Sequence, residues 1–310
     1  MLSCGTQNYC FFSTLLHALQ TMYQHMNANN WFNLGEFIET EGNQLFVVDT
    51  KDRDEVLLIL HGYPTSSFDY CKVLPLLTEK YRVIVHDHLG FGFSDKPKKA
   101  SYSLVNQAQR ALQLWKQMGI KKATILAHDY GTSVATEIIA LHNEGKVDLE
   151  IEQLILCNGS IHIEYSQLRT IQKLLRNKWT GPLVAKLTNY PIFKKNMRNI
   201  YFDKSKVSDE ELEEMWSVLN YNHGKRIVHE LTQYITERYL YWDRWVGALK
   251  TTKIPTKIIW AKNDPIAIPK IGELLASEIP NNEIYWMENT GHFLMLENPK
   301  EWSKLVLKSS

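Results

Sequence analysis

The hydrophobic pattern of this chain alternates between short, continuously apolar runs and longer segments whose apolar residues recur at helical spacing. The apolar runs are residues 56–60, 82–85, 123–127, 154–157, 256–261 and 283–287. Such runs are typical of strands that are buried on both faces of a parallel sheet. Helical segments are expected between them, through residue 77 and again over residues 103–118. The sequence therefore predicts an α/β fold with a mostly parallel central sheet flanked by helices.

The N-terminal part of this pattern is different. Residues 36–39 and 45–49 alternate between apolar and polar positions, and the turn formers Glu41-Gly42-Asn43 separate them. This arrangement predicts an antiparallel hairpin at the edge of the sheet.

Residues 160–249 interrupt the alternation of strands and helices. They contain several helical patterns and no strand-like run, after which the strand pattern returns at residue 256. A helical block inserted into such a series predicts a lid over the sheet. We therefore expect a core made of residues 31–159 and 250–310, with residues 160–249 as the lid.

Residues 1–30 form a separate N-terminal segment. Residues 9–23 are apolar and aromatic, but His17 and Gln20 interrupt them. The stretch is shorter and more polar than the roughly 20 apolar residues that a membrane-spanning helix needs. No basic region precedes it, as a signal peptide would require. We expect an interfacial or a frayed amphipathic helix here; in the interfacial case the segment associates with a membrane surface.

Composition narrows the function classes. The 310 residues are 44% hydrophobic and 22% charged, as in a soluble globular protein. A formal net charge of +1 gives no reason to expect nucleic acid or an anionic membrane as a partner. The four cysteines (Cys4, Cys10, Cys71, Cys157) show no paired spacing. They favour a reducing compartment. We expect an intracellular protein that is either cytosolic or associated with the endoplasmic-reticulum membrane.

The most informative stretch is residues 121–135. The apolar run at 123–127 ends abruptly at His128-Asp129-Tyr130-Gly131, and a helical pattern follows at once. A strand-to-helix turn this tight lifts its central residue, Asp129, clear of the sheet. An aspartate is ionised at neutral pH and can act as a nucleophile without a base. The alternative is that Asp129 only caps the following helix.

Two further polar residues follow the last two predicted strands of the chain. Asp264 comes after the run at 256–261, and His292 comes after the run at 283–287. The carboxyl ends of parallel strands meet at one edge of a sheet, so both residues should approach Asp129 there. Separately, Asp264 could be only a turn former and His292 an ordinary packed histidine. Together they follow the chain order of nucleophile, acid and histidine in a catalytic triad.

Five motifs carry a family resemblance. They are HGYPTSS (61–67), DHLGFGFSDKP (87–97), AHDYG (127–131), WAKNDP (260–265) and GHF with ENP (291–299). They resemble the branch of the α/β-hydrolase superfamily that contains haloalkane dehalogenases and epoxide hydrolases. A closer similarity, to one group in that branch, extends from Trp31 to the end of the chain. It rests on Trp31, GEF (35–37), HDYG (128–131), NG (158–159) and RWVGAL (244–249).

This resemblance implies a mechanism in two steps. Asp129 attacks a carbon atom of a small apolar substrate and forms an ester. His292, oriented by Asp264, then removes a proton from water, which hydrolyses the ester. The backbone N–H groups of Tyr63 and Tyr130 would hold the oxyanion. Water is the only co-substrate, and neither a metal nor an organic cofactor is needed.

Two departures from the family pattern bear on the substrate. Dehalogenases usually have a tryptophan after the nucleophile and many have an asparagine in the H-G-x-P loop; this chain has Tyr130 and Tyr63. Dehalogenation is therefore the second choice. Epoxide hydrolases use lid tyrosines as acids, and Tyr234 is the best-placed candidate here, although most tyrosines simply pack.

Other functions stay open at this point. A serine esterase or acyltransferase would need a different nucleophile, and Ser133 lies on the helix after the turn, not at its apex. The fold could also serve as a non-catalytic scaffold, although all three triad residues are retained.

Overall fold

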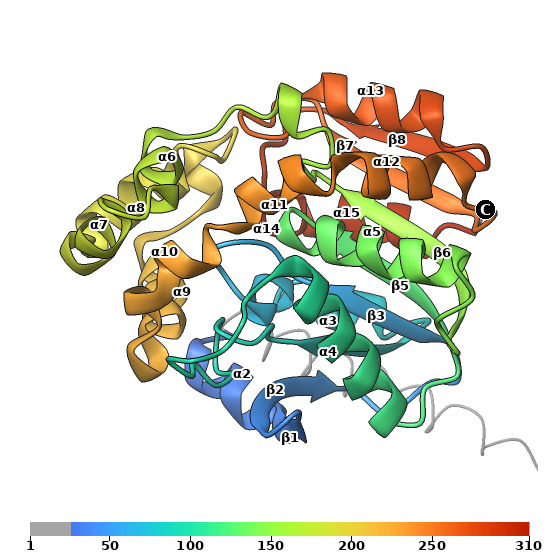
Figure 1. The fold of residues 1–310 in the computed structure, drawn as a ribbon, viewed down its shortest axis with the longest axis horizontal. Coiled ribbons are helices and arrows are strands. Elements are labelled where there is room, and N and C mark those ends of the chain that lie inside the picture. The colour runs from blue at the N-terminus through green and yellow to red at the C-terminus, as the bar shows by residue number, and fades with distance from the viewer. Residues whose placement is uncertain (1–25, 310) are drawn as a thin grey trace, which may run out of the picture.

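An eight-stranded sheet forms the centre of the computed structural model, which describes residues 26–309. The strand order is β1-β2-β4-β3-β5-β6-β7-β8 (Figure 1). The strands are β1 (Glu36–Thr40), β2 (Asn43–Asp49), β3 (Val56–Leu60), β4 (Arg82–His86), β5 (Lys122–His128), β6 (Glu150–Cys157), β7 (Thr256–Ala261) and β8 (Asn282–Met287). The amphipathic helix expected at residues 9–23 lies outside the described residues.

The direction of the strands confirms the predicted α/β-hydrolase fold. All neighbouring pairs from β4 to β8 are parallel, while β1, β2 and β4 pair antiparallel. The β1–β2 hairpin turns at Glu41 and Gly42, whose φ angles of 53° and 74° are both left-handed. This geometry matches the right-handed twist of the flanking strands and explains the tight register of the hairpin.

Helices cover both faces of the sheet. One face carries α4 (Leu104–Gln117), α5 (Tyr130–Asn143), α12 (Trp242–Thr251) and α13 (Pro269–Glu278). The other face carries α3 (Leu74–Leu77), α14 (Leu294–Glu297) and α15 (Pro299–Leu307), with α2 (Ala28–Leu34) near the hairpin. The chain thus has the three layers that parallel strands, buried on both faces, require.

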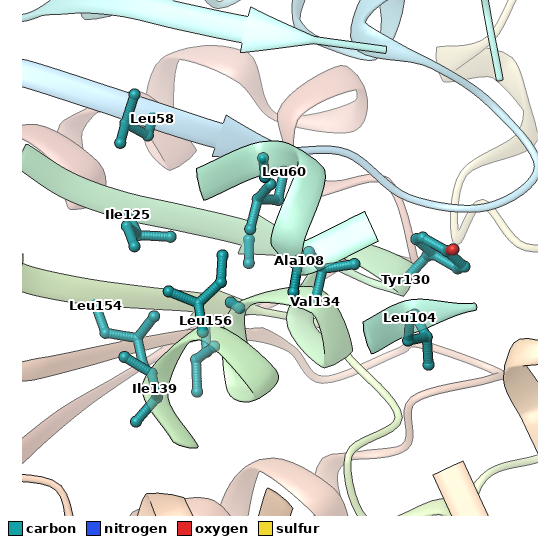
Figure 2. Packing of buried hydrophobic residues seen from close by; sticks show 14 of the residues in the cluster. Leu58, Leu60, Leu104, Ala108, Ile125, Tyr130, Val134, Ile139, Leu154 and Leu156 are labelled. Atoms are coloured by element: carbon teal, nitrogen blue, oxygen red, sulfur yellow. The ribbon is translucent and has the colours of Figure 1, made fainter. Parts of the chain in front are cut away.

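The core on the α4–α5 side shows why the apolar runs become strands. Leu58 and Leu60 of β3 and Ile125 of β5 point toward Ala108 of α4 and Val134 of α5 (Figure 2). Their side chains are fully buried. Burial of each leucine or isoleucine contributes about 1.5–3 kcal/mol relative to exposure, so this packing fixes the position of α5 and of the turn before it.

The segment between β6 and β7 contains helices and, within residues 160–249, no strand. Its helices are α6 (Thr170–Arg176), α7 (Gly181–Leu187), α8 (Tyr190–Arg198), α9 (Asp209–Asn220), α10 (Val228–Leu231), α11 (Tyr234–Leu240) and most of α12. The role of residues 160–249 as a lid stays a prediction. No helix in the described part of the chain is both long enough and apolar enough to cross a membrane.

Helix α12 lies along α5 in the layer of core helices (Figure 1). The buried Glu137 of α5 accepts hydrogen bonds from Trp245 Nε1 at 2.7 Å and from Arg244 Nε at 2.9 Å. These two residues begin the RWVGAL motif, so the motif joins the end of the inserted segment to the core.

A close approach at Gly131 brings α5 against β3. A Cβ atom at this position would lie 2.1 Å from the carbonyl oxygen of Leu60. The contact is with rigid backbone, so it cannot be relieved by a side-chain rotation. Glycine is therefore required where the helix leaves the turn.

We expect Gly131→Ala to lower the free energy of unfolding by roughly 2 kcal/mol or more, because the added methyl group pushes α5 from the sheet. Gly247→Ala is the matched control. Gly247 lies within α12 and a Cβ there would meet no atom within 4 Å. The free energy of unfolding of that variant should rise by up to about 1 kcal/mol because alanine has the higher helix propensity. Urea unfolding measures both, and equal stability of the two variants would contradict the close approach.

Candidate active site

Asp129 occupies the apex of the turn between β5 and α5. Its φ of 46° and ψ of −107° are unusual for a residue with a side chain. Such strain persists only where the surrounding structure over-determines it. Here Gly62 also allows a close approach, since a Cβ at that position would lie 3.1 Å from Asp129 Cβ.

The two carboxylate oxygens of Asp129 have different surroundings. Oδ1 accepts hydrogen bonds from the backbone N–H of Tyr63 at 3.0 Å and of Tyr130 at 2.5 Å. Oδ2 lies 3.5 Å from His292 Nε2. One oxygen is thus held by the backbone of two loops, and the other faces the imidazole.

His292 links Asp129 to Asp264. Its Nδ1 lies 2.7 Å from Asp264 Oδ2. Asp264 Oδ1 accepts from the backbone N–H groups of Ile266 and Ala267 at 2.7 and 3.1 Å. The structure therefore brings together Asp129, Asp264 and His292, all of them buried, in the order expected from the sequence.

Burial and charge act against one another in this site. Burial alone would raise the pKa of Asp129, but the hydrogen bond and charge of His292 and the charge of Arg238 outweigh it and hold that pKa below its ordinary value. Burial alone would lower the pKa of His292, but the charges and hydrogen bonds of Asp264 and Asp129 raise it to about 10. Both shifts favour an Asp129 carboxylate that faces a protonated His292.

Asn158 supports the acid and was not singled out as a site residue from the sequence. Its Nδ2 donates to Asp264 Oδ2 at 2.6 Å, and its Oδ1 accepts from the N–H of Ala261 at 2.9 Å. Its φ of 37° is left-handed, a region that asparagine tolerates better than most residues. The Asn-Gly pair directly after a strand was the available signal.

Arg238 of α11 was also missed. Its side chain is buried; Nε donates to Ser133 Oγ at 2.7 Å and Nη2 donates to the backbone carbonyl of Asp129 at 3.0 Å. The guanidinium lies 4.6 Å from the centre of the Tyr234 ring. Nothing in the surrounding sequence distinguishes this arginine from the exposed ones, because its burial depends on the docking of α11.

Three tyrosines meet beside the aspartate. The Tyr234 ring lies 5.2 Å from that of Tyr63 and 5.4 Å from that of Tyr130. The Tyr234 hydroxyl accepts from Gln172 Nε2 at 3.0 Å. The Tyr63 hydroxyl donates to Thr232 Oγ1 at 2.7 Å, since the Thr232 hydroxyl itself donates to Val228. The hydroxyls of Tyr63 and Tyr234 therefore both bond to residues of the inserted segment. Tyr63 and Tyr130 offer Asp129 their backbone N–H groups.

A cavity of about 100 Å³ opens at Asp129 and His292. Tyr63 and Gln172 also line it, and Tyr63 is the single tyrosine among its described lining residues. Most of the wall is apolar and comes from the inserted segment: Ile171, Leu175, Ala185, Ile192, Phe193, Met197, Trp216 and Leu219. Within the described residues, no group of three histidine, cysteine or acidic side chains is placed to hold a metal ion.

Comparison with known proteins identifies the family of the chain. The profile of the α/β hydrolase fold family matches residues 55–299. The chain belongs to the α/β-hydrolase fold family. It is a hydrolase of that superfamily, and proteins described as an epoxide hydrolase and a haloalkane dehalogenase are among its neighbours in fold.

Two relatives show the similarity in sequence. The protein LipZ of Mycobacterium tuberculosis is 34% identical over 91% of this chain and 97% of its own length. The mesoderm-specific transcript protein of Mus musculus is 33% identical over 87% of this chain and 84% of its own. The latter belongs to the group that the motifs from Trp31 onward indicated, and that resemblance is confirmed.

Two solved structures show the similarity in fold. The epoxide hydrolase CorEH has a TM-score of 0.71 at 22% identity, covering 88% of this chain and 96% of its own. A protein described as an ancestral haloalkane dehalogenase, AncHLD2, has a TM-score of 0.74 at 18% identity, covering 87% and 96%. At these identities the likeness concerns the fold alone.

The raised pKa of His292 predicts a pH dependence of stability. The unfolded chain releases the proton near pH 6.5 and the folded chain near pH 10. The contribution of protonated His292 to the free energy of unfolding is therefore complete below about pH 6.5 and is lost as pH rises toward 10. Each unit of pKa difference is worth about 1.4 kcal/mol, so the free energy of unfolding should fall by several kcal/mol over this range.

His292→Gln should remove most of that decline, as measured by urea unfolding between pH 6 and pH 10. His142→Gln is the matched control, because His142 is half-exposed near the end of α5. A decline of the same size in wild type and His292→Gln would contradict the coupling of His292 to the two carboxylates.

Proposed function

We propose that this hydrolase uses Asp129 as a nucleophile, through a covalent ester, on a small or lipid-like apolar substrate, and that an epoxide is the favoured substrate class. The observation that carries the proposal is the different surroundings of the two oxygens of Asp129. Oδ1 has two backbone donors, whereas Oδ2 faces His292, and both Asp129 and His292 line the cavity. This is the arrangement that an attacking carboxylate and a later oxyanion require.

In the first step, a lone pair of Asp129 Oδ2 forms a bond to an epoxide carbon while the ring C–O bond breaks. The ring oxygen keeps the electron pair and takes up a proton. We propose Tyr234 as the acid. Burial raises the pKa of this phenol, so it stays protonated, and its hydroxyl accepts a hydrogen bond from Gln172, a residue that lines the cavity.

In the second step, His292 takes a proton from water and the hydroxide attacks Cγ of Asp129. The negative charge that develops on Oδ1 is stabilised by the N–H groups of Tyr63 and Tyr130; in comparable sites one such donor is worth about 3–4 kcal/mol. The Cγ–Oδ2 bond then breaks, and Oδ2 leaves with the product and takes the second proton of the attacking water from the new carboxyl group. The oxygen from water stays in the regenerated carboxylate, and the net reaction is addition of water to the epoxide.

Ester formation itself prepares His292 for this role. The resting imidazole is protonated because two carboxylates face it. Alkylation converts Asp129 into a neutral ester, which removes one of the two charges that raise the pKa of His292. The histidine then gives up its proton more readily, which restores the phenol of Tyr234 after ring opening, and Asp264 keeps the imidazole oriented.

Other reactions rank lower. Tyr130 and Tyr63 stand where dehalogenases usually place halide-binding side chains, so a haloalkane is the second candidate substrate. Ester hydrolysis or acyl transfer through a serine has less support, because Ser133 Oγ is buried on α5 and accepts from Arg238. A non-catalytic scaffold would not need the separate positioning of the two Asp129 oxygens.

His292→Gln should accumulate the ester, because attack by Asp129 needs no base whereas hydrolysis does. With a panel of epoxides, haloalkanes and esters, mass spectrometry of the peptide that contains Asp129 should show an adduct of the substrate's mass. Asp129→Asn should form none at first. Turnover that persists in Asp129→Ala would sink the mechanism, and the absence of both adduct and turnover with every compound would favour the scaffold.

The two half-reactions should respond differently to pH. Because the pKa of Asp129 is held low, formation of the ester should continue as pH falls. Hydrolysis should slow about tenfold per pH unit below the pKa of His292 in the ester. Rapid-quench measurement under single turnover separates the steps; if both fell in parallel, the division of roles between Asp129 and His292 would be wrong.

A further inference from the structure

Helices α6, α7 and α8 lie together at one end of the molecule (Figure 1, left). Their outer surface is apolar to an extent that needs an explanation. Trp179, between α6 and α7, is 80% exposed, and Leu183 and Leu187 of α7 are 58% and 62% exposed. Exposed clusters of large apolar side chains mark interaction sites more often than isolated ones do.

The inner faces of the same helices are apolar too. Ala185 of α7 and Leu175 of α6 line the cavity, while Leu187 and Leu174 point outward. A helix that is apolar on both faces is normally buried on both. Ile192 of α8 lines the cavity and is also exposed, so the cavity wall and the outer surface are separated by a single layer of helices.

The charge of this region is one-sided. Residues 166–202 contain no aspartate or glutamate and eight basic residues: Arg169, Lys173, Arg176, Lys178, Lys186, Lys194, Lys195 and Arg198. Lys173, Lys178 and Lys186 are exposed. None of the ion pairs found in residues 26–309 includes them. The whole-chain charge of +1 conceals this local excess.

We propose that this surface docks on an anionic phospholipid membrane. The outer patch consists of Leu174, Trp179, Leu183 and Leu187 with Lys173, Lys178 and Lys186. Tryptophan is favoured at the interface between water and lipid, leucines enter the acyl boundary, and lysines are attracted to anionic headgroups. An acidic protein would explain the charges but not the exposed tryptophan and leucines beside them.

Docking of the outer patch would bring the membrane against the helices that form the cavity wall. An apolar substrate could then move from the bilayer to the cavity along α8 without crossing bulk water. The docking itself goes beyond the proposed reaction and does not depend on it, because binding to a membrane needs no nucleophile.

The test uses the full chain and flotation with vesicles of phosphatidylcholine alone or mixed with phosphatidylserine. Wild type should partition more strongly onto the anionic vesicles. A lysine near an anionic surface strengthens binding to it roughly fivefold. The variant Lys173→Gln/Lys178→Gln/Lys186→Gln should therefore bind the anionic vesicles at least tenfold more weakly than wild type. The matched control is Lys98→Gln/Lys99→Gln/Lys253→Gln, which replaces exposed lysines elsewhere and should keep it.

A second variant tests the apolar contribution. Trp179→Ala/Leu183→Ser/Leu187→Ser should lose partition onto both kinds of vesicle, whereas Tyr239→Ser/Leu240→Ser, which changes side chains that are 52% and 71% exposed, should not. Hydrogen exchange of the wild type should show protection within residues 173–187 on vesicle addition. Urea unfolding confirms that each variant is folded.

The proposal is overturned if wild type does not bind vesicles. It is also overturned if both outer-patch variants bind as wild type does, which is the result expected if residues 9–23 alone bind the membrane. Asp129→Asn should bind as wild type. A failure of the reaction and a failure of the docking are therefore distinguished in the same set of proteins.

Discussion

The contact on which the site depends is the pair of backbone N–H groups that hold Oδ1 of Asp129. One comes from Tyr63, after β3, and the other from Tyr130, at the start of α5. They converge because β3 and β5 are neighbours in the sheet and Gly131 lets α5 approach Leu60. The contact fixes the carboxylate's orientation, and with it which oxygen can face His292.

The strands and the turn at Asp129 could be predicted because they depend on local pattern. A continuous apolar run needs burial on two faces wherever it lies. A strand that meets a helix within one residue leaves few backbone conformations for the residue at the turn. The helix expected through residue 77 was partly wrong: the chain forms a short 3-10 helix at Ser67–Tyr70 and then α3. The carboxylate of Asp87 accepts from Ser67 N–H at 2.7 Å and holds this loop from a distant position in the sequence.

The residues that were missed share one property: their roles depend on contacts between segments that are far apart in the sequence. Asn158 supports Asp264 only once β6 and β7 are paired, and Arg238 reaches Asp129 only once α11 is docked. Likewise, the net charge of the chain is a sum over its whole length, and it balances the basic surface of α6 and α7 against acids elsewhere. The net charge therefore gave no reason to expect an anionic membrane as a partner, whereas the placement of the lysines in the fold does.

Arg238 also limits how the inserted segment can move. Its guanidinium is bonded to the backbone carbonyl of Asp129, and the adjacent Glu237 accepts from Leu104 N–H at the start of α4 at 2.7 Å. The end of the segment nearest the nucleophile is thus anchored to two core helices, and α12 continues that anchor along α5. A rigid-body movement of the whole segment would break the hydrogen bond from Arg238 to the backbone carbonyl of Asp129. Any motion that leaves the nucleophile undisturbed must therefore keep α11 and α12 in place.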